Sequence, residues 1–98
     1  MALIKMRIYR TSGEVLLAAC DSELLGREFS EGDLRLKISV FYDGILVGRD
    51  ELVRNLRMAT IANIVGEEVV GIAVEEGFVD RNCVIKVDGI PHAQMVLM

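Results

Sequence analysis

The sequence is poor in the residues from which catalytic and metal sites are most often built. Its 98 residues include one histidine, one proline, two cysteines and no tryptophan. Neither Cys-x-x-Cys nor His-x-x-x-His spacing is present, which excludes the usual zinc motifs. Two cysteines are also too few for a disulfide framework, so we expect both to be free thiols in a reducing compartment. We therefore expect no metal and no cofactor.

Long apolar runs and leader-like segments are missing as well. The longest uninterrupted apolar run covers residues 15–20, which is far shorter than a membrane span. The N-terminus enters a strand-like pattern at once and lacks the charged, apolar and cleavable segments of a signal peptide. We expect a cytoplasmic protein with no membrane partner.

Positive charge is scarce overall but unevenly placed. The net charge of −4 disfavours unspecific attraction to phosphate backbones, so we expect no DNA partner. The first ten residues nevertheless hold Lys5, Arg7 and Arg10 without any acid. The stretch 67–80 holds five acids without any base. The two signs of charge are therefore expected on different parts of the surface.

Apolar residues are abundant for so short a chain. They make up 52% of the sequence, whereas 98 residues suffice for only one core, so we expect a single domain over residues 1–98. A small domain has much surface for its volume and cannot bury all of this apolar material. Exposed apolar patches commonly mark contact surfaces. We expect a homo-oligomer, specifically a dimer.

The spacing of the apolar residues predicts strands first and helices later. Alternation over residues 4–9 predicts a strand with one wet face, and the continuous run 15–20 predicts a strand covered on both faces at the centre of a sheet. Residues 34–41 alternate most regularly. Helical spacing begins at Asp50 and predicts a first helix over 50–59 and a second from about 64 or 66 to 76. Two more strands are predicted over 84–87 and 93–98.

This order has no repeated strand–helix–strand rhythm. It predicts an α+β fold in which two main helices pack on one face of a small, mostly antiparallel sheet. Local signals add an N-cap at Asp21 for a short helical turn, a cap at Asp50, and a left-handed stop at Gly77. Pro91 predicts an edge strand or a bulge.

Several strings of residues are unlike ordinary core or surface. They are Ala18 to Gly26 (AACDSELLG), Asp88 to Gln94 (DGIPHAQ), Asn63 to Glu67 (NIVGE) and Phe41 to Gly44 (FYDG). In this order they resemble the archaeal family known as domain of unknown function 424, over nearly the whole chain. The resemblance implies a small stand-alone archaeal protein of unassigned activity. It implies no catalytic residues.

Two of these strings contain the candidates for chemistry. A thiolate at Cys20 would be stabilised by the N-terminus of a following helical turn, and His92 is the one imidazole that could activate it. The alternative is a buried structural thiol and a histidine that hydrogen-bonds a turn. Cys20, Asp21, Cys83 and His92 are also zinc-ligand types, but they come from separate segments and give a weak signal.

A polar pocket is a second hypothesis. If the loops converge, Asp21, Asn63, His92 and Gln94 would line a small cavity at a helix N-terminus. Such a cavity suits an anionic or amide-bearing ligand. The plain alternative for Asn63 is a cap on the second helix.

A basic sheet face is a third hypothesis. Lys5, Arg7, Arg35 and Lys37 lie on the outward sides of two predicted strands, and Tyr9 and Phe41 could stack on bases. A basic face with aromatic rings is one way to bind single-stranded RNA. An ordinary solvated face is commoner, and the negative net charge favours it.

The sequence thus favours a non-enzymatic binding or adaptor protein that recognises a partner protein or RNA. The alternative is a small enzyme or ligand-binding domain that uses the Cys20/Asp21 and His92/Gln94 loops.

Overall fold

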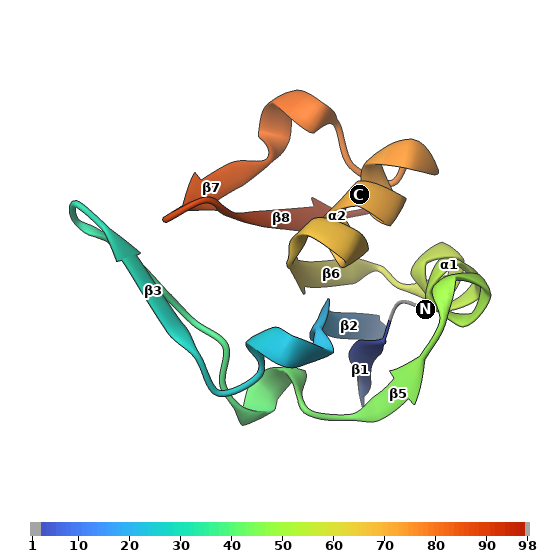
Figure 1. Ribbon diagram of the computed structural model, residues 1–98. Coiled ribbons are helices and arrows are strands. Elements are labelled where there is room, and N and C mark those ends of the chain that lie inside the picture. Colours follow the sequence, from blue (N-terminus) through green and yellow to red (C-terminus); the bar gives the residue numbers. More distant parts are fainter. Residues whose placement is uncertain (1–2, 98) are drawn as a thin grey trace.

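The structure is a computed structural model that describes residues 3–97. Two α-helices and eight strands make an α+β fold (Figure 1). The strands are β1 (Ile4–Thr11), β2 (Glu14–Asp21), β3 (Glu28–Glu31), β4 (Leu34–Lys37), β5 (Ile45–Val47), β6 (Ile61–Val65), β7 (Ile85–Val87) and β8 (Ile90–Val96). The helices are α1 (Arg49–Met58) and α2 (Glu67–Glu75), and three short 3-10 turns are η1 (Ser22–Leu24), η2 (Val40–Tyr42) and η3 (Arg81–Cys83).

The main sheet is mixed, and the prediction of a mostly antiparallel sheet was wrong. Its order is β5-β1-β2-β6-β8-β7, and the central pair β2 and β6 is parallel. The reason is β6 itself, because residues 64–65 were assigned to the second helix and the strand between the helices was missed. A five-residue segment that is mostly apolar cannot be told from a helix segment by its periodicity.

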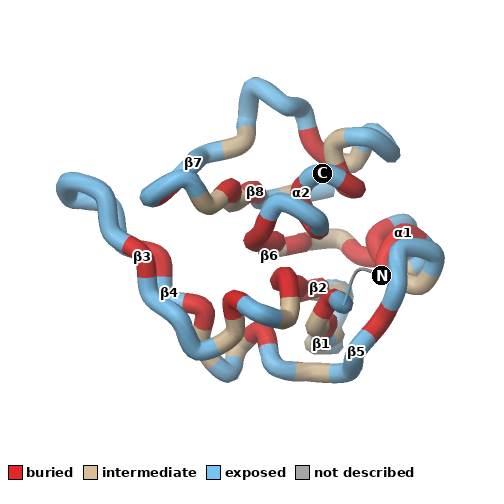
Figure 2. Tube along the Cα trace, in the orientation of Figure 1, coloured by how far each residue is buried: buried red, intermediate tan, exposed pale blue. Residues whose placement is uncertain are grey.

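Both helices lie on one face of this sheet, as the sequence predicts. The core on that face joins Leu52 and Leu56 of α1 and Val69 and Ala73 of α2 to sheet residues such as Leu17. Figure 2 shows buried residues concentrated along β2, β6 and the inner sides of the helices. β2 is central, as predicted, and it is buried from Leu17 onward, whereas Val15 and Leu16 are only half-buried.

The opposite face is partly covered by an element that the sequence did not predict. β3 and β4 form a separate two-stranded sheet, and Phe29 and Leu36 from this hairpin pack with Cys20 and Val65 of the main sheet. The expected long strand over 34–41 was therefore wrong, since it ends at Lys37. The side chain of Ser39 accepts a hydrogen bond from the Phe41 amide and starts η2 instead.

The ends of the elements correct several local expectations. Gly48, not Asp50, is the N-cap of α1, and Gly77 has the expected positive φ of 82° after α2. Pro91 lies in β8, which is an inner strand, and its carbonyl accepts the Gly66 amide. The expected end of the last strand at Met98 lies outside the described residues. Within residues 3–97 no helix is long and apolar enough to span a membrane.

The junction between β2 and α2 depends on Asp21. The sequence predicts that Asp21 caps η1, but its side chain makes no such hydrogen bond. It accepts hydrogen bonds from the α2 amides of Glu68 at 3.1 Å and Val69 at 3.0 Å instead. The N-cap of α2 is Gly66, which has no side chain to satisfy these amides. The Asp21 carboxylate, at the end of β2, therefore caps α2 although it is distant from the helix in the sequence.

Gly66 is shaped for this contact. Its φ of 115° and ψ of 152° lie in a region that only glycine adopts readily. A Cβ added there would lie 2.6 Å from either carboxylate oxygen of Asp21. The absent side chain thus gives the carboxylate room to reach the helix.

We predict that Asp21→Ala lowers the free energy of unfolding by about 2–3 kcal/mol, because one buried and one partly buried amide lose a charged acceptor. Asp21→Asn retains one acceptor and should cost less. Gly66→Ala should also destabilise the fold, through its backbone strain and its clash with the carboxylate. Urea unfolding followed by circular dichroism measures each change.

The double variant provides the control. In an Asp21→Ala background the clash is gone, so Gly66→Ala should cost only its backbone strain, about 1–3 kcal/mol. Costs that simply add would contradict the proposed contact.

Candidate functional site

The structure separates Cys20 from His92. Cys20 pairs with Val65 on β6, and Val65 pairs with His92 on β8. The two residues share a face of the sheet, but a whole strand lies between them, about 9–10 Å from backbone to backbone. The hypothesis of a Cys20–His92 dyad is therefore wrong.

The environment of Cys20 also opposes a nucleophilic role. Its side chain is fully buried against the β3–β4 hairpin. Burial, helped by the negative charges of Asp21 and Asp43, raises the pKa of the Cys20 thiol to about 11. A thiol with this pKa carries almost no thiolate at neutral pH. Cys20 is a core residue.

The weak metal set does not converge either. Asp21 pairs with Ile4 on the helix-facing side of the sheet, whereas Cys20 faces the hairpin. Cys83 is exposed in η3. No group of three or more metal-ligand side chains occurs in the part of the chain that the structure describes.

Three of the four predicted pocket residues do come together. Asn63 and Gln94 are register partners on β6 and β8, and the Gln94 Nε2 donates to the Asn63 Oδ1 at 2.8 Å. His92 lies two residues before Gln94 and therefore on the same face. Asp21 lies on the other face, where it is held by α2. The prediction that all four residues line one pocket is therefore wrong. The expectation that Asn63 caps the second helix is also wrong, since it lies in β6.

His92 and Gln94 border a small hollow at the β7 side of the sheet. It has a volume of about 250 Å³ and is also lined by Cys83, Ile85 and Ala93. Desolvation by burial lowers the pKa of His92 below its ordinary value of 6.5. The imidazole is therefore neutral at physiological pH.

These residues belong to a larger surface, which we call the open sheet face. It lies opposite the helices, beyond the end of the sheet that the β3–β4 hairpin covers. The register across the four strands β1, β2, β6 and β8 aligns Arg7 with Ala18, Asn63 and Gln94, and Tyr9 with Leu16, Ile61 and Val96. The open sheet face consists of Arg7, Leu16, Ile61, Asn63, His92, Gln94 and Val96.

The four predicted basic residues do not form one patch. The Lys5 Nζ is bound to Asp43 and to the Gly44 carbonyl, each at 3.4 Å. The guanidinium of Arg7 lies over the Tyr9 ring, 4.7 Å from its centre. Arg35 and Lys37 lie on β4, on the side of the hairpin opposite the buried Leu36. Only Arg7 contributes to the open sheet face.

The predicted aromatic pair is engaged within the fold. The rings of Tyr9 and Phe41 stack with centres 5.1 Å apart, and the Tyr9 hydroxyl donates to the Phe41 carbonyl at 2.7 Å. The Tyr9 ring lies at the border of the open sheet face, and its contacts with Phe41 and Arg7 hold it in place.

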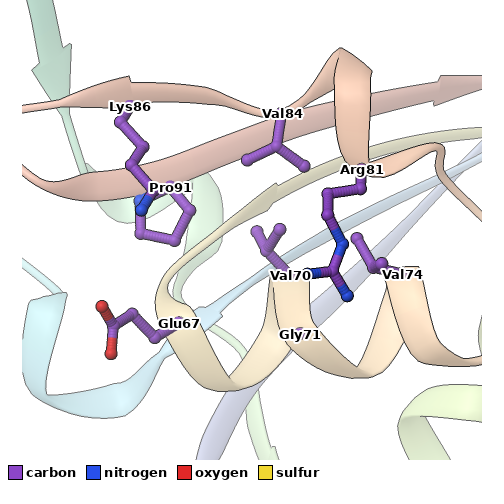
Figure 3. A pocket seen from close by; sticks show the side chains of 8 residues that line it. All are labelled: Glu67, Val70, Gly71, Val74, Arg81, Val84, Lys86 and Pro91. Atoms are coloured by element: carbon purple, nitrogen blue, oxygen red, sulfur yellow. The ribbon is translucent and has the colours of Figure 1, made fainter.

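A groove on the helix side was not predicted from the sequence. It has a volume of about 550 Å³ and lies between α2, η3 and the β7–β8 hairpin (Figure 3). Arg81 and Lys86 extend toward the helix from the upper wall in the view of Figure 3. The groove is lined by Glu67, Val70, Gly71, Val74, Arg81, Val84, Lys86 and Pro91.

Gly71 is the signal that could have identified this groove. A glycine inside a helix costs about 0.5–1 kcal/mol relative to alanine. Gly71 lies within α2, and a Cβ built on it would meet no atom within 4 Å. Unlike Gly66, Gly71 therefore has no neighbour within the chain that requires a glycine at this position. A glycine inside a predicted helix therefore marks a place where something outside the chain could approach closely.

We predict that iodoacetamide at neutral pH modifies Cys83 and spares Cys20, because the Cys20 thiol is buried and un-ionised. Mass spectrometry of tryptic peptides measures both rates. Under urea the two should react alike, which controls for intrinsic reactivity. Labelling of Cys20 as fast as Cys83 in the folded protein would contradict its burial.

We predict that His92 titrates below 6.5 in the folded protein, as followed by NMR. The unfolded chain takes up a proton first as the pH falls, so stability contributed by neutral His92 is present above pH 6.5 and lost below it. His92→Gln should flatten this part of the stability profile. An unchanged profile would show that other groups cause the loss.

Comparison with known proteins gives a family but no activity. A family described as protein of unknown function (DUF424) matches residues 9–98. A search of curated proteins finds no match. The chain is similar to a crystal structure described as an uncharacterized conserved protein from Methanopyrus kandleri, with 30% sequence identity and a TM-score of 0.82 over 96% of this chain and 90% of that one. The chain belongs to the DUF424 family of proteins of unknown function, as the motifs in its sequence indicate.

Proposed function

We propose that the protein is a non-enzymatic cytoplasmic binding protein that recognises a partner protein through the open sheet face. The observation that carries the proposal is the composition of this face. Apolar Leu16, Ile61 and Val96 form the register row beside the hydrogen-bonded Asn63 and Gln94, and Val96 is 61% exposed. Apolar groups with a few fixed hydrogen-bonding groups are the usual content of a protein interface.

The kind of charge favours a protein over RNA. Single-stranded RNA is held mainly by several cations along its backbone and by rings with free faces. Of the predicted basic residues, Arg7 alone contributes to this face, and the adjacent Tyr9 ring is stacked on Phe41. Arginine and tyrosine are among the residues that most often dominate protein interfaces. A partner with apolar side chains and a carboxylate for Arg7 fits this surface.

The alternative of a small enzyme loses its main residues to the fold. Cys20 is a buried thiol with a raised pKa, and Asp21 is bound to two amides of α2. His92 and Gln94 retain a small hollow that the exposed Cys83 also lines, but among the described residues no hydrogen bond joins His92 to this thiol or to an acid. Binding is the simpler function for such a surface.

Val96→Lys distinguishes the two partner classes. A lysine on the open sheet face should weaken an apolar protein contact by about tenfold or more, and should strengthen any RNA binding. Met58→Lys is the matched control, because Met58 is 62% exposed at the end of α1, which lies on the other side of the sheet from this face. Both variants add one charge.

The partner is first captured from source-cell extract by a photo-crosslinking phenylalanine analogue in place of Gln94, with the same analogue at Met58 for comparison. Calorimetry with the purified partner then measures both lysine variants, and oligouridylate anisotropy tests RNA. The proposal fails if Gln94 captures nothing beyond the Met58 control. It also fails if Val96→Lys leaves partner binding unchanged, or if the protein binds oligouridylate and Val96→Lys tightens it.

A further inference from the structure

The exposed side of α2 lies between two flanks of different charge, with the cations Arg81 and Lys86 of neighbouring elements at the groove and acids of the helix on the other flank. Glu68 and Glu75 lie three residues before and four after Gly71, so they share one side of the helix. Glu67 and Val74 lie on the other side, at the groove. A smaller cavity of about 150 Å³ on the acidic side is lined by Arg49, Glu67, Glu68, Gly71, Ile72 and Glu75, so Glu67 borders both hollows. Gly71 therefore lies where two hollows meet.

The charges on each flank are only partly satisfied within the chain. Among residues 3–97, no ion pair involves Arg81, Lys86, Glu67 or Glu68. On the acidic side, Arg49 binds Glu75 and Glu76, at 2.5 and 2.9 Å. The groove side thus offers free cations over apolar walls, and the other side offers a surplus of carboxylates.

We propose that two copies of the chain associate through this surface, with their α2 helices parallel and side by side around a two-fold axis that passes Gly71. Such an axis brings the groove side of each copy against the acidic side of the other. Glu68 and Glu75 of one copy then lie over the groove of its partner, near Arg81 and Lys86. Their methylene groups cover Val74 and Val84.

Gly71 has a direct role in this arrangement. The distance between packed helices depends on the side chains at their contact, and glycine permits the shortest one. The two Gly71 residues face each other at the axis. The cost of a glycine inside α2 is then explained by the contact between copies.

A second copy is favoured over another partner because the complementary charge belongs to the same chain. A self-complementary surface is the requirement for a two-fold dimer. The groove also exposes apolar walls beside free cations, which a lone molecule would leave to water. This proposal uses the helix side and is independent of partner binding at the open sheet face.

Charge swapping tests the interface. Variant one carries Arg81→Glu and Lys86→Glu, so both of its flanks are acidic. Variant two carries Glu68→Lys and Glu75→Lys, so its exposed flanks are basic, while Arg49 keeps Glu76. Sedimentation equilibrium at micromolar to millimolar concentration should give a dimer of the 10.9 kDa chain for the wild type and monomers for each variant alone. An equal mixture of the two variants should restore the dimer.

Two controls separate the interface from the fold. Arg35→Glu with Lys37→Glu makes the same change of charge on the hairpin and should leave the dimer intact. Gly71→Leu should weaken association by tenfold or more without lowering the unfolding temperature of the monomer, because a helix favours leucine over glycine. The circular dichroism of every variant should match that of the wild type.

Three results would overturn the proposal. The first is a wild-type protein that sediments as a monomer throughout this range. The second is a dimer that persists in both charge variants and in Gly71→Leu, which would place the interface elsewhere. The third is two folded monomeric variants whose mixture remains monomeric. None of these results bears on the open sheet face.

Discussion

The bond between Asp21 and the first turn of α2 is the constraint on which the arrangement of the molecule depends. It joins the end of the central strand to the helix that covers it, across 47 and 48 residues of sequence. Two orphan amides of the helix receive a charged acceptor, which also suits the positive end of the helix dipole. Because Gly66 leaves room for the carboxylate, the helix can begin directly after β6. The direction of α2, and with it the position of the groove, follows from this contact.

The same strand explains why Cys20 and Asp21 do not form a shared site. Cys20 and Asp21 are neighbours in sequence, but a strand sends neighbouring side chains to opposite faces. Cys20 enters the core beneath the hairpin and Asp21 enters the helix layer. Cys20 and Asp21 are therefore separated by the sheet, and the first contributes to packing whereas the second caps a helix.

Much of the fold follows from local patterns, and the strands that were missed have one cause. The alternation in β1, the apolar run of β2, the helical spacing of α1 and the Asp88-Gly89 turn each have a local signal, and each element is present. The missed strands β3, β5 and β6 have three to five residues, too few for a period to be recognised. Missing β6 also hid the parallel pairing, because no local pattern specifies which strand will be its neighbour.

The candidate sites show the same limit. Asn63, His92 and Gln94 were correctly grouped because β6 and β8 bring their polar residues into register. The inclusion of Asp21 is wrong because its side chain lies on the helix-facing side of β2, where the amides of α2 bind it. The groove was missed because its walls come from α2, η3 and β7, and only Gly71 gives a hint of it within one element. Sites made from one pair of strands are easier to predict than sites made from three elements.

The α2 surface and the open sheet face lie on opposite sides of the sheet, so both can be occupied at the same time. The α2 surface is in the helix layer, and the open sheet face is on the other side. A dimer formed through α2 would leave both open sheet faces uncovered and directed away from each other. Such a dimer could hold two partner molecules, or two sites on one large partner, and the second contact would form at a high effective concentration. Weak contacts at each sheet face would then be sufficient, which suits a face with several apolar groups and a single free cation.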